Sequence, residues 1–238
     1  DNSQSPVPDL SRILPRVSVI VPALHEEANL PHVLPRIPPS VGEVLVIDGH
    51  STDATIAVAR RLHPKVRIVH QKGSGKGDAL RCGFAEARGD FIVTLDADGS
   101  MRPEEMPRFL APLCDGYDVA KGTRFKGDGG SSDMERHRVF GNRILAMVTN
   151  LMHGSRYTDV TYGYSAFRKG CLSKANLSGE GFTIETEMAI KFRKARLAVI
   201  EIPSYEDARL HGNGKLRSFR DGGLILETII REFFNGRN

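Results

Sequence analysis

Two aspartates, Asp96 and Asp98, follow directly after a short apolar run in the segment GDFIVTLDADGS, residues 89–100. The run 91–95 predicts a β-strand, and in extended chain residues i and i+2 point to the same face. Two carboxylates on one face repel each other unless a cation lies between them. Mg²⁺ is usually held by one or two carboxylates together with water and substrate phosphates. The pair is therefore a candidate divalent-metal site for a ligand that carries phosphates.

The same residues are also typical of a turn, in which aspartate side chains bond the backbone. The context favours a metal, because the pair ends an apolar strand and no basic residue lies nearby in the sequence. A metal at this point would neutralise a diphosphate and support its departure when a bond to it breaks. A nucleoside-diphosphate sugar fits this chemistry, since the nucleoside diphosphate is its leaving group.

Alternating strands and helices must position this pair. We expect strands at 16–23, 43–49, 65–71 and 91–96, a helix at 51–62 capped by Ser51 or Thr52, and a second helix that follows a glycine turn and ends at Gly89. This order predicts parallel βαβ units in a sheet covered on both faces. Ligands bind such sheets at the carboxyl ends of the strands, where we expect Pro22, Asp48 and Asp96.

The second half of the chain is more irregular. We expect strands at 118–125 and 197–205, extended chain at 159–170, helices at 134–154, 184–195 and 223–234, and a long polar loop at 126–138. In the helix at 134–154, Ile144, Met147, Val148 and Leu151 are predicted to form one stripe. We predict a disordered lead-in at 1–15 and one domain at 16–238. That domain divides into a nucleotide-binding half (16–100), an acceptor half (101–220) and an amphipathic C-terminal helix (221–238).

The composition is that of an ordinary globular protein, with 40% hydrophobic and 26% charged residues and a net charge of +4. No apolar run approaches the ~18 residues of a membrane-spanning helix. Three cysteines without metal-site spacing favour reduced thiols and a cytoplasmic location. We expect no nucleic-acid binding, because the chain has no zinc-finger spacing and no aromatic and basic RNA motif.

Four segments, VSVIVPALHEEANL, VLVIDGHSTDAT, GKGDALRCGF and GDFIVTLDADGS, together resemble the family 2 glycosyltransferases of the GT-A fold. In the second half KGTRF, DVTYGYSAF, FTIETEM and EIPSYEDARLHGNGKL are similar to the polyprenol-phosphate sugar transferases. The resemblance covers residues 16–220 and implies an α/β, Rossmann-like GT-A fold. It also implies an inverting transfer, dependent on Mg²⁺ or Mn²⁺, from a UDP- or GDP-linked sugar to a polyprenyl phosphate.

The resemblance assigns roles to individual residues. Nucleotide-sugar binding falls to Pro22, Leu24, Glu26, Val46, Asp48, Asp96 and Ala97, with Asp98 as principal metal ligand and Asp96 assisting. Transfer itself would involve Asp98, Arg124, Arg209 and Lys215. Lys76, in the glycine turn, could reach a phosphate, although a solvated surface lysine is the simpler expectation. Departures from the family pattern at Leu24, His25, Gly49 and Gly214, and in TYGYSAF, leave the donor base and the sugar open.

The acceptor decides whether the enzyme needs a base. A hydroxyl acceptor needs a carboxylate to take its proton, whereas a phosphate monoester with a second pKa of about 6 is already anionic. The candidate bases are Asp159, Glu185 and Glu187, of which the last two cannot both face the site, and Asp159, Glu185 and Arg138 are expected on the acceptor side. The chain lacks the tryptophan of the Arg-Trp signature in processive synthases. It offers cations for a phosphate instead, at Arg136, Arg138, Arg143, Arg168, Arg209 and Lys215.

The C-terminal helix could lie in a membrane surface, although docking on the domain's own core is the simpler expectation. A polyprenol substrate still predicts peripheral membrane contact or a membrane partner.

Three alternatives remain open. One is the same donor chemistry with a soluble acceptor, as in glucosyl-phosphoglycerate synthases or natural-product glycosyltransferases. Another is a sugar-nucleotide nucleotidyltransferase, which should carry a glycine- and arginine-rich loop where this chain has VPALHEEANL. The third is a module that binds nucleotide sugar without turnover.

Overall fold

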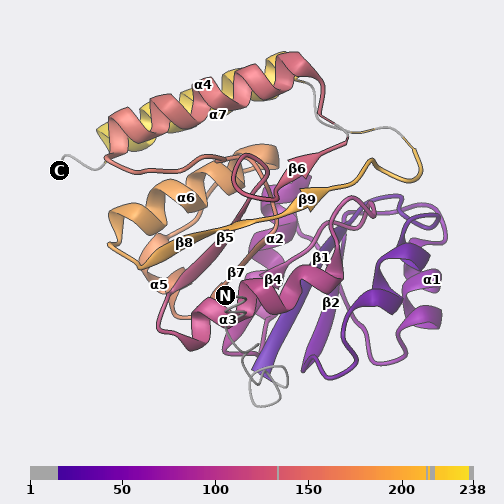
Figure 1. Ribbon diagram of the computed structural model, residues 1–238. Coiled ribbons are helices and arrows are strands. Elements are labelled where there is room, and N and C mark those ends of the chain that lie inside the picture. The colour runs from indigo at the N-terminus through magenta and orange to yellow at the C-terminus, as the bar shows by residue number, and fades with distance from the viewer. Residues whose placement is uncertain (1–15, 133, 213, 215–217, 236–238) are drawn as a thin grey trace, which may run out of the picture.

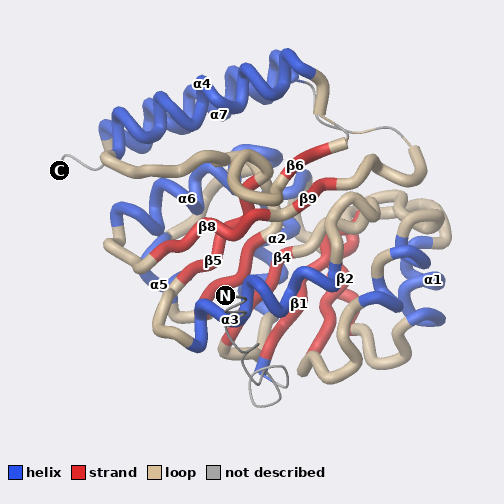
Figure 2. Tube along the Cα trace, viewed as in Figure 1, coloured by secondary structure: helices blue, strands red, loops and turns tan. Residues whose placement is uncertain are grey.

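The computed structural model describes residues 16–132, 134–212, 214 and 218–235. The lead-in predicted at 1–15 and the predicted phosphate-binding Lys215 lie outside the described residues. Within them the chain forms a central sheet with helices on both faces (Figures 1 and 2).

The central sheet has seven strands in the order β3-β2-β1-β4-β7-β5-β8. β7 runs antiparallel to both of its neighbours and the other pairs are parallel, which confirms the mainly parallel sheet that was predicted. A second, two-stranded sheet pairs β6 with β9. The strands are β1 (Val17–Ala23), β2 (Glu43–Asp48), β3 (Arg67–His70), β4 (Phe91–Thr94), β5 (Val119–Thr123), β6 (Gly130–Ser131), β7 (Ser165–Arg168), β8 (Val199–Pro203) and β9 (Tyr205–Glu206).

Successive residues of the inner strands supply the two hydrophobic cores. Val19 and Val21 pack on one side of the sheet with Leu110 of α3 (Met106–Cys114), whereas Ile20 packs on the other with Leu80 of α2 (Gly75–Glu86). This alternation is what extended chain imposes on a sheet that is buried on both faces. The helices are α1 (Thr55–Leu62), α2 (Gly75–Glu86), α3 (Met106–Cys114), α4 (Arg136–His153), α5 (Cys171–Ala175), α6 (Ile184–Lys194) and α7 (Ser218–Phe234).

Helix starts differ most from the predictions. The helix expected from residue 51 begins at Thr55, because the Ser51 hydroxyl accepts from the His25 amide and is not available as a cap. The Asp53 carboxylate bonds the Thr55 amide instead. Residues that follow β1 form two short 3₁₀ turns, Leu30–His32 and Leu34–Arg36, each with a proline in its first turn.

Helices α4 and α7 lie side by side next to α6 (Figure 1). They run parallel, since His137 stacks on Phe219 at one end and His153 meets Phe233 at the other. Ile225 and Ile229 of α7 pack on Ile190 of α6, which confirms that the C-terminal helix docks on the protein's own core.

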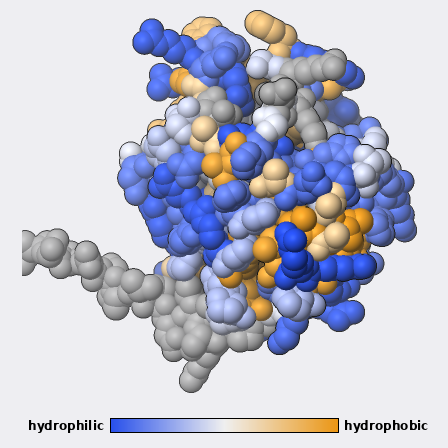
Figure 3. Space-filling model, turned by 90° about the vertical axis from the view of Figure 1, so that its right-hand side faces the viewer, coloured by the Kyte–Doolittle hydropathy of each residue, from blue (hydrophilic) through white to orange (hydrophobic). Residues whose placement is uncertain are grey.

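The stripe predicted on α4 is split between two faces. Val148 packs inward against α6 and α7, whereas Ile144, Met147 and Leu151 are exposed. No helix within the described residues is both long and apolar enough to cross a membrane. On the side that α1 presents, hydrophilic side chains predominate and apolar ones gather in the lower part (Figure 3).

Candidate active site at the carboxyl ends of the strands

The carboxyl ends of β1, β2 and β4 meet where the sequence predicted a ligand. Asp48 ends β2 opposite Ala23 of β1, and Asp96 follows β4 by two residues. The buried Asp48 carboxylate accepts from the Ser51 amide at 3.2 Å and lies 3.2 Å from His70 Nδ1. Asp48 therefore holds the loop after β2 in place at this edge of the sheet.

The other residues assigned to the donor differ in accessibility. Pro22 and Leu24 are half-buried near the carboxyl end of β1, and Glu26 is buried. The side chains of Val46 and Ala97 belong to the hydrophobic core. These two positions could therefore contact a donor only through their backbone.

Lys76 is not a solvated surface lysine. Its Nζ lies 2.6 Å and 2.8 Å from the two oxygens of Asp96 and 2.8 Å from Glu185 Oε1. A Cβ at Gly163 would lie 2.8 Å from that Nζ, so a larger residue at this point would displace the lysine from its present position. Apart from this ion pair with Lys76, the two buried Glu185 oxygens have no hydrogen-bond partner among the described residues.

The charges in this cluster set each other's pKa values. Burial raises the pKa of Asp96 to about 6, and the nearby Asp98 charge adds to this, while Lys76 opposes it. Burial lowers the pKa of Lys76, but attraction to Asp96 and Glu185 outweighs it and the net direction is upward. Lys76 therefore stays charged at neutral pH and keeps Asp96 ionised in a partly dry environment.

Asp98 is held by a different set of groups. Its Oδ1 accepts from the Ser100 amide at 3.0 Å and from the Ser100 hydroxyl at 2.7 Å, and its Oδ2 lies 3.3 Å from Arg209 NH1. Arg209 NH2 also bonds both Glu26 oxygens, at 2.6 and 2.7 Å. Asp96 and Asp98 can therefore lie close together, because each is paired with its own cation from another segment of the chain, Lys76 and Arg209 respectively.

Arg124, directly after β5, forms a buried network. Its guanidinium contacts Asp159 at 2.8 Å, Glu206 at 3.1 Å and the Thr161 hydroxyl at 2.9 Å. Burial would raise the Asp159 pKa, but Arg124 and Lys121 outweigh it and lower the value to about 2. A carboxylate that is paired in this way is a poor proton acceptor, so Asp159 is not suited to be the base.

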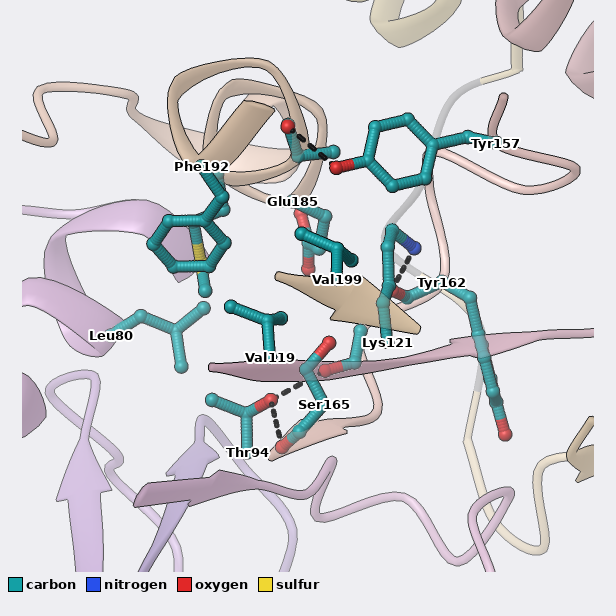
Figure 4. Close-up of a pocket in the computed structure, with 13 residues that line it drawn as sticks. Leu80, Thr94, Val119, Lys121, Tyr157, Tyr162, Ser165, Glu185, Phe192 and Val199 are labelled. Atoms are coloured by element: carbon teal, nitrogen blue, oxygen red, sulfur yellow. Dashed lines mark hydrogen bonds between the residues drawn. The ribbon is translucent and has the colours of Figure 1, made fainter. Parts of the chain in front are cut away.

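The two glutamates of α6 have different surroundings, as predicted. Glu187 accepts from the Ser178 and Gly179 amides and pairs with Lys191, which fixes the preceding loop. Glu185 faces Lys76 and lies beside a small cavity between the sheet and α6 (Figure 4). Lys121 extends from β5 into the same cavity, and burial lowers its pKa.

The predicted phosphate-binding cations do not all reach the site. The Arg143 guanidinium and that of Arg124 each lie 5.9 Å from the Phe125 ring, which places α4 next to the Arg124 network. Arg138 is half-buried and Arg136 exposed at the start of α4. Arg168 was predicted wrongly, because β7 is antiparallel and pairs Arg168 with Phe91 at the amino end of β4.

The carboxylates of Asp96 and Asp98 could hold a metal ion only if substrate oxygens complete its ligand shell. Within the described part of the chain no three His, Cys, Asp or Glu side chains gather as a metal site. One or two carboxylates with phosphate oxygens and water form the usual Mg²⁺ shell, and Asp98 with Asp96 matches that donor set.

Several residues of the site were missed from the sequence. Ser100 could have been found, since a serine two residues after an aspartate often bonds its side chain. Thr161, Lys121 and Glu206 gave no such signal, because their roles arise from tertiary contacts with Arg124 and its partners.

Comparison with known proteins assigns the chain to a family. Residues 18–175 match the model of Glycosyl transferase family 2. Glycosyltransferase AglJ of Haloferax volcanii is 33% identical over 218 residues, covering 90% of this chain and 71% of the relative. Dolichol-phosphate mannosyltransferase of Pyrococcus furiosus is 30% identical over 223 residues, covering 90% of this chain and 62% of the relative.

A solved structure has the same fold. It is glucosyl-3-phosphoglycerate synthase from Mycobacterium tuberculosis in complex with Mn²⁺, uridine diphosphate and glucosyl-3-phosphoglycerate. It matches with a TM-score of 0.70 and 25% identity, over 92% of this chain and 79% of that one. The predicted GT-A fold is thereby confirmed, and the chain is a glycosyltransferase that belongs to Glycosyl transferase family 2.

Proposed function

We propose that the protein is a metal-dependent, inverting glycosyltransferase that moves a sugar from a nucleoside-diphosphate sugar to a polyprenyl phosphate. The observation that carries the proposal is the pair of cation-balanced aspartates, Asp96 and Asp98, at the carboxyl end of β4. The name of the Pyrococcus furiosus relative, a dolichol-phosphate mannosyltransferase, supports a lipid phosphate as acceptor.

On the donor side, Pro22, Leu24 and Asp48 would line the base and Glu26 the ribose. The base is that of a UDP- or GDP-linked sugar. Asp98 would be the principal ligand of Mg²⁺ or Mn²⁺, since Lys76 already engages both oxygens of Asp96. The ion would neutralise the diphosphate as the bond to the sugar breaks.

Three cations of the chain would serve the diphosphate. Arg209 lies between Asp98 and Glu26, so release from these carboxylates would bring its guanidinium to the donor phosphates. Lys215 is assigned the same role by resemblance. Arg124 would contribute its positive charge without contacting the diphosphate, because its guanidinium N–H groups already donate to Asp159, Glu206 and Thr161.

On the acceptor side, the scarcity of a usable base favours a phosphate. Asp159 is paired with Arg124 and its pKa is lowered to about 2, and Glu185 is paired with Lys76. A phosphate monoester is already anionic at neutral pH and needs no base. Its oxygen would attack the anomeric carbon on the face opposite the diphosphate, so that one C–O bond forms while another breaks and the configuration inverts. Arg138 would bind the incoming phosphate.

A soluble phosphorylated acceptor is the second candidate. The similar Mycobacterium tuberculosis structure contains glucosyl-3-phosphoglycerate, whose acceptor part is a soluble acid. The exposed Arg143, beside Phe125 and next to the Arg124 network, would suit the phosphate of either acceptor.

We infer a cytoplasmic location with peripheral membrane contact from the proposed acceptor. A polyprenyl chain stays in the bilayer, so the crevice must reach the membrane surface.

The test is a transfer assay with radiolabelled UDP- and GDP-sugars. Polyprenyl phosphate in detergent and 3-phosphoglyceric acid are offered separately, with Mg²⁺, Mn²⁺ or EDTA. We expect a metal-dependent lipid-linked product that Asp98→Asn does not make. Product with phosphoglyceric acid alone would replace the lipid acceptor by the soluble one, and EDTA-resistant transfer would refute the metal.

A further inference from the structure

Strand β8 is the last strand of the central sheet, so one of its two edges has no neighbouring strand (Figure 1). On the paired edge, the Ala198 carbonyl accepts from the Val119 amide of β5 at 3.1 Å. The backbone groups of successive residues point to opposite edges of a strand. Val199 and Glu201 therefore direct both their N–H and their C=O groups to the open edge of β8.

The backbone groups on this open edge are unpaired. Among the described residues, no hydrogen bond reaches the N–H or the C=O of Val199 or Glu201 on that side. Both residues are half-buried, so solvent reaches the edge. A row of unpaired N–H and C=O groups is a template on which another extended chain can pair.

A groove of about 510 Å³ follows the same edge. Val199 and Ile200 both line it, although successive residues of a strand face opposite sides of the sheet. The groove therefore lies along the edge of the strand and not over one face of the sheet. Its other walls include residues 154–157, which follow α4, and Arg193 near the end of α6. We call it the β8 groove.

Positive charge dominates the β8 groove. Lys126, Arg156 and Arg193 line it, and Glu201 is the one acid among the described residues that do so. Lys126 and Arg156 are exposed, and neither side chain pairs with an acid in the described part of the chain. The Glu201 carboxylate is already engaged, because it accepts from the Thr158 amide at 2.7 Å and the Thr158 hydroxyl at 3.0 Å. The groove thus favours an anionic ligand.

We propose that the β8 groove binds an extended, acidic segment of a partner protein, which adds to the central sheet as a further strand. A polypeptide answers both features, because its backbone pairs with β8 while its carboxylates meet the lysine and the arginines. A small inorganic anion would pair with the cations and leave the row of backbone groups unpaired. A second copy that paired through its own β8 would bring two sets of cations together.

The proposal is independent of the proposed reaction, since no residue assigned to the donor or the acceptor lines the groove. It is tested by NMR hydrogen exchange on the whole protein with a short peptide of alternating glutamate and threonine. In the protein alone, the amides of Val199 and Glu201 should exchange faster than those of Ile200 and Ile202, which face β5. Saturating peptide should slow exchange at Val199 and Glu201 at least about tenfold, because each amide gains a hydrogen bond.

Charge and strand pairing are tested separately. The double substitution Lys126→Glu and Arg156→Glu should weaken peptide binding at least about tenfold, because two attractions become repulsions. Arg60→Glu changes an exposed arginine of α1, which lies far from β8 (Figure 1), and this matched control should bind as the parent does. A peptide that is N-methylated at every amide keeps its charge but has no N–H to donate, and it should not bind.

Each other outcome overturns the proposal. If Val199 and Glu201 are already slow to exchange in the protein alone, the edge is covered. Absence of protection at millimolar peptide, or equal binding of the N-methylated peptide, would reject strand addition. Equal binding of a lysine and threonine peptide would reject the selection of acidic chains. A parent that is dimeric by light scattering, and whose Val199 amide loses protection on dilution, would assign the groove to a second copy.

Discussion

Replacing Lys76 by methionine removes the cation from two largely buried carboxylates. Lys76 lies within 2.8 Å of both Asp96 oxygens and of Glu185 Oε1, and the Glu185 side chain is only 5% exposed. Removing one partner of a buried ion pair costs ~3–5 kcal/mol, because the other charge remains buried. The Asp96 side chain is 26% exposed and regains some hydration, so we expect the lower end, about 3 kcal/mol of unfolding free energy.

Urea denaturation of Lys76→Met, Glu185→Gln and the double variant measures this cost as a double-mutant cycle. The double variant should be more stable than Lys76→Met, since it no longer buries the Glu185 charge. Arg16→Met is the control, because Arg16 and Asp90 form an exposed ion pair that should contribute less than about 1 kcal/mol. A loss below about 1 kcal/mol in Lys76→Met, or single effects that simply add, would refute the reasoning.

Further predictions concern the neighbouring groups. Asp98→Ala should lower metal-dependent transfer more than about 100-fold, while the unfolding free energy changes by less than about 1 kcal/mol; a stable, fully active variant would end the metal assignment. Arg209→Ala should weaken nucleotide binding in calorimetry about tenfold, since charge-assisted hydrogen bonds are lost; unchanged affinity would reject its phosphate role. Asp159 has a folded pKa lowered to about 2. Its contribution to the free energy of unfolding is therefore fully present above about pH 4 and is lost as the pH falls through about 2. The difference in unfolding free energy between the parent and Asp159→Asn should therefore shrink over that interval, and a constant difference would contradict the lowered pKa. Gly163→Ala would put a Cβ 2.8 Å from Lys76 Nζ and should reduce transfer; unchanged activity would show that Lys76 can move without consequence.

The part of the site that lies on regular strands could be predicted from the sequence. β1, β2 and β4 are apolar runs that end in turn residues, so their pattern placed Asp48 and Asp96 at one edge of the sheet. The helix starts were less predictable, because tertiary contacts decide which polar side chain is free to cap: Ser51 bonds His25 instead.

Cation partners could not be predicted, because they come from remote segments. Arg209 and Glu26 are separated by 183 positions, and nothing local marks them as a pair. Lys76 was expected in solvent, since the sequence does not show that α2 delivers it next to Glu185. Arg168 was misplaced for a topological reason: the direction of β7 reverses within the sheet.

The bond between Arg209 and Asp98 has a consequence for the order in which ligands arrive. A divalent ion that binds alone must displace the Arg209 guanidinium from Asp98 and gives that guanidinium no new anion to pair with. A nucleotide that binds alone brings its negative phosphates next to the negative carboxylates of Asp98 and Glu26. When both bind, the metal ion takes the place of Arg209 at Asp98, and Arg209 moves from the carboxylates to the nucleotide phosphates. Their binding should therefore be synergistic, and by reciprocity each should raise the affinity of the other by the same factor.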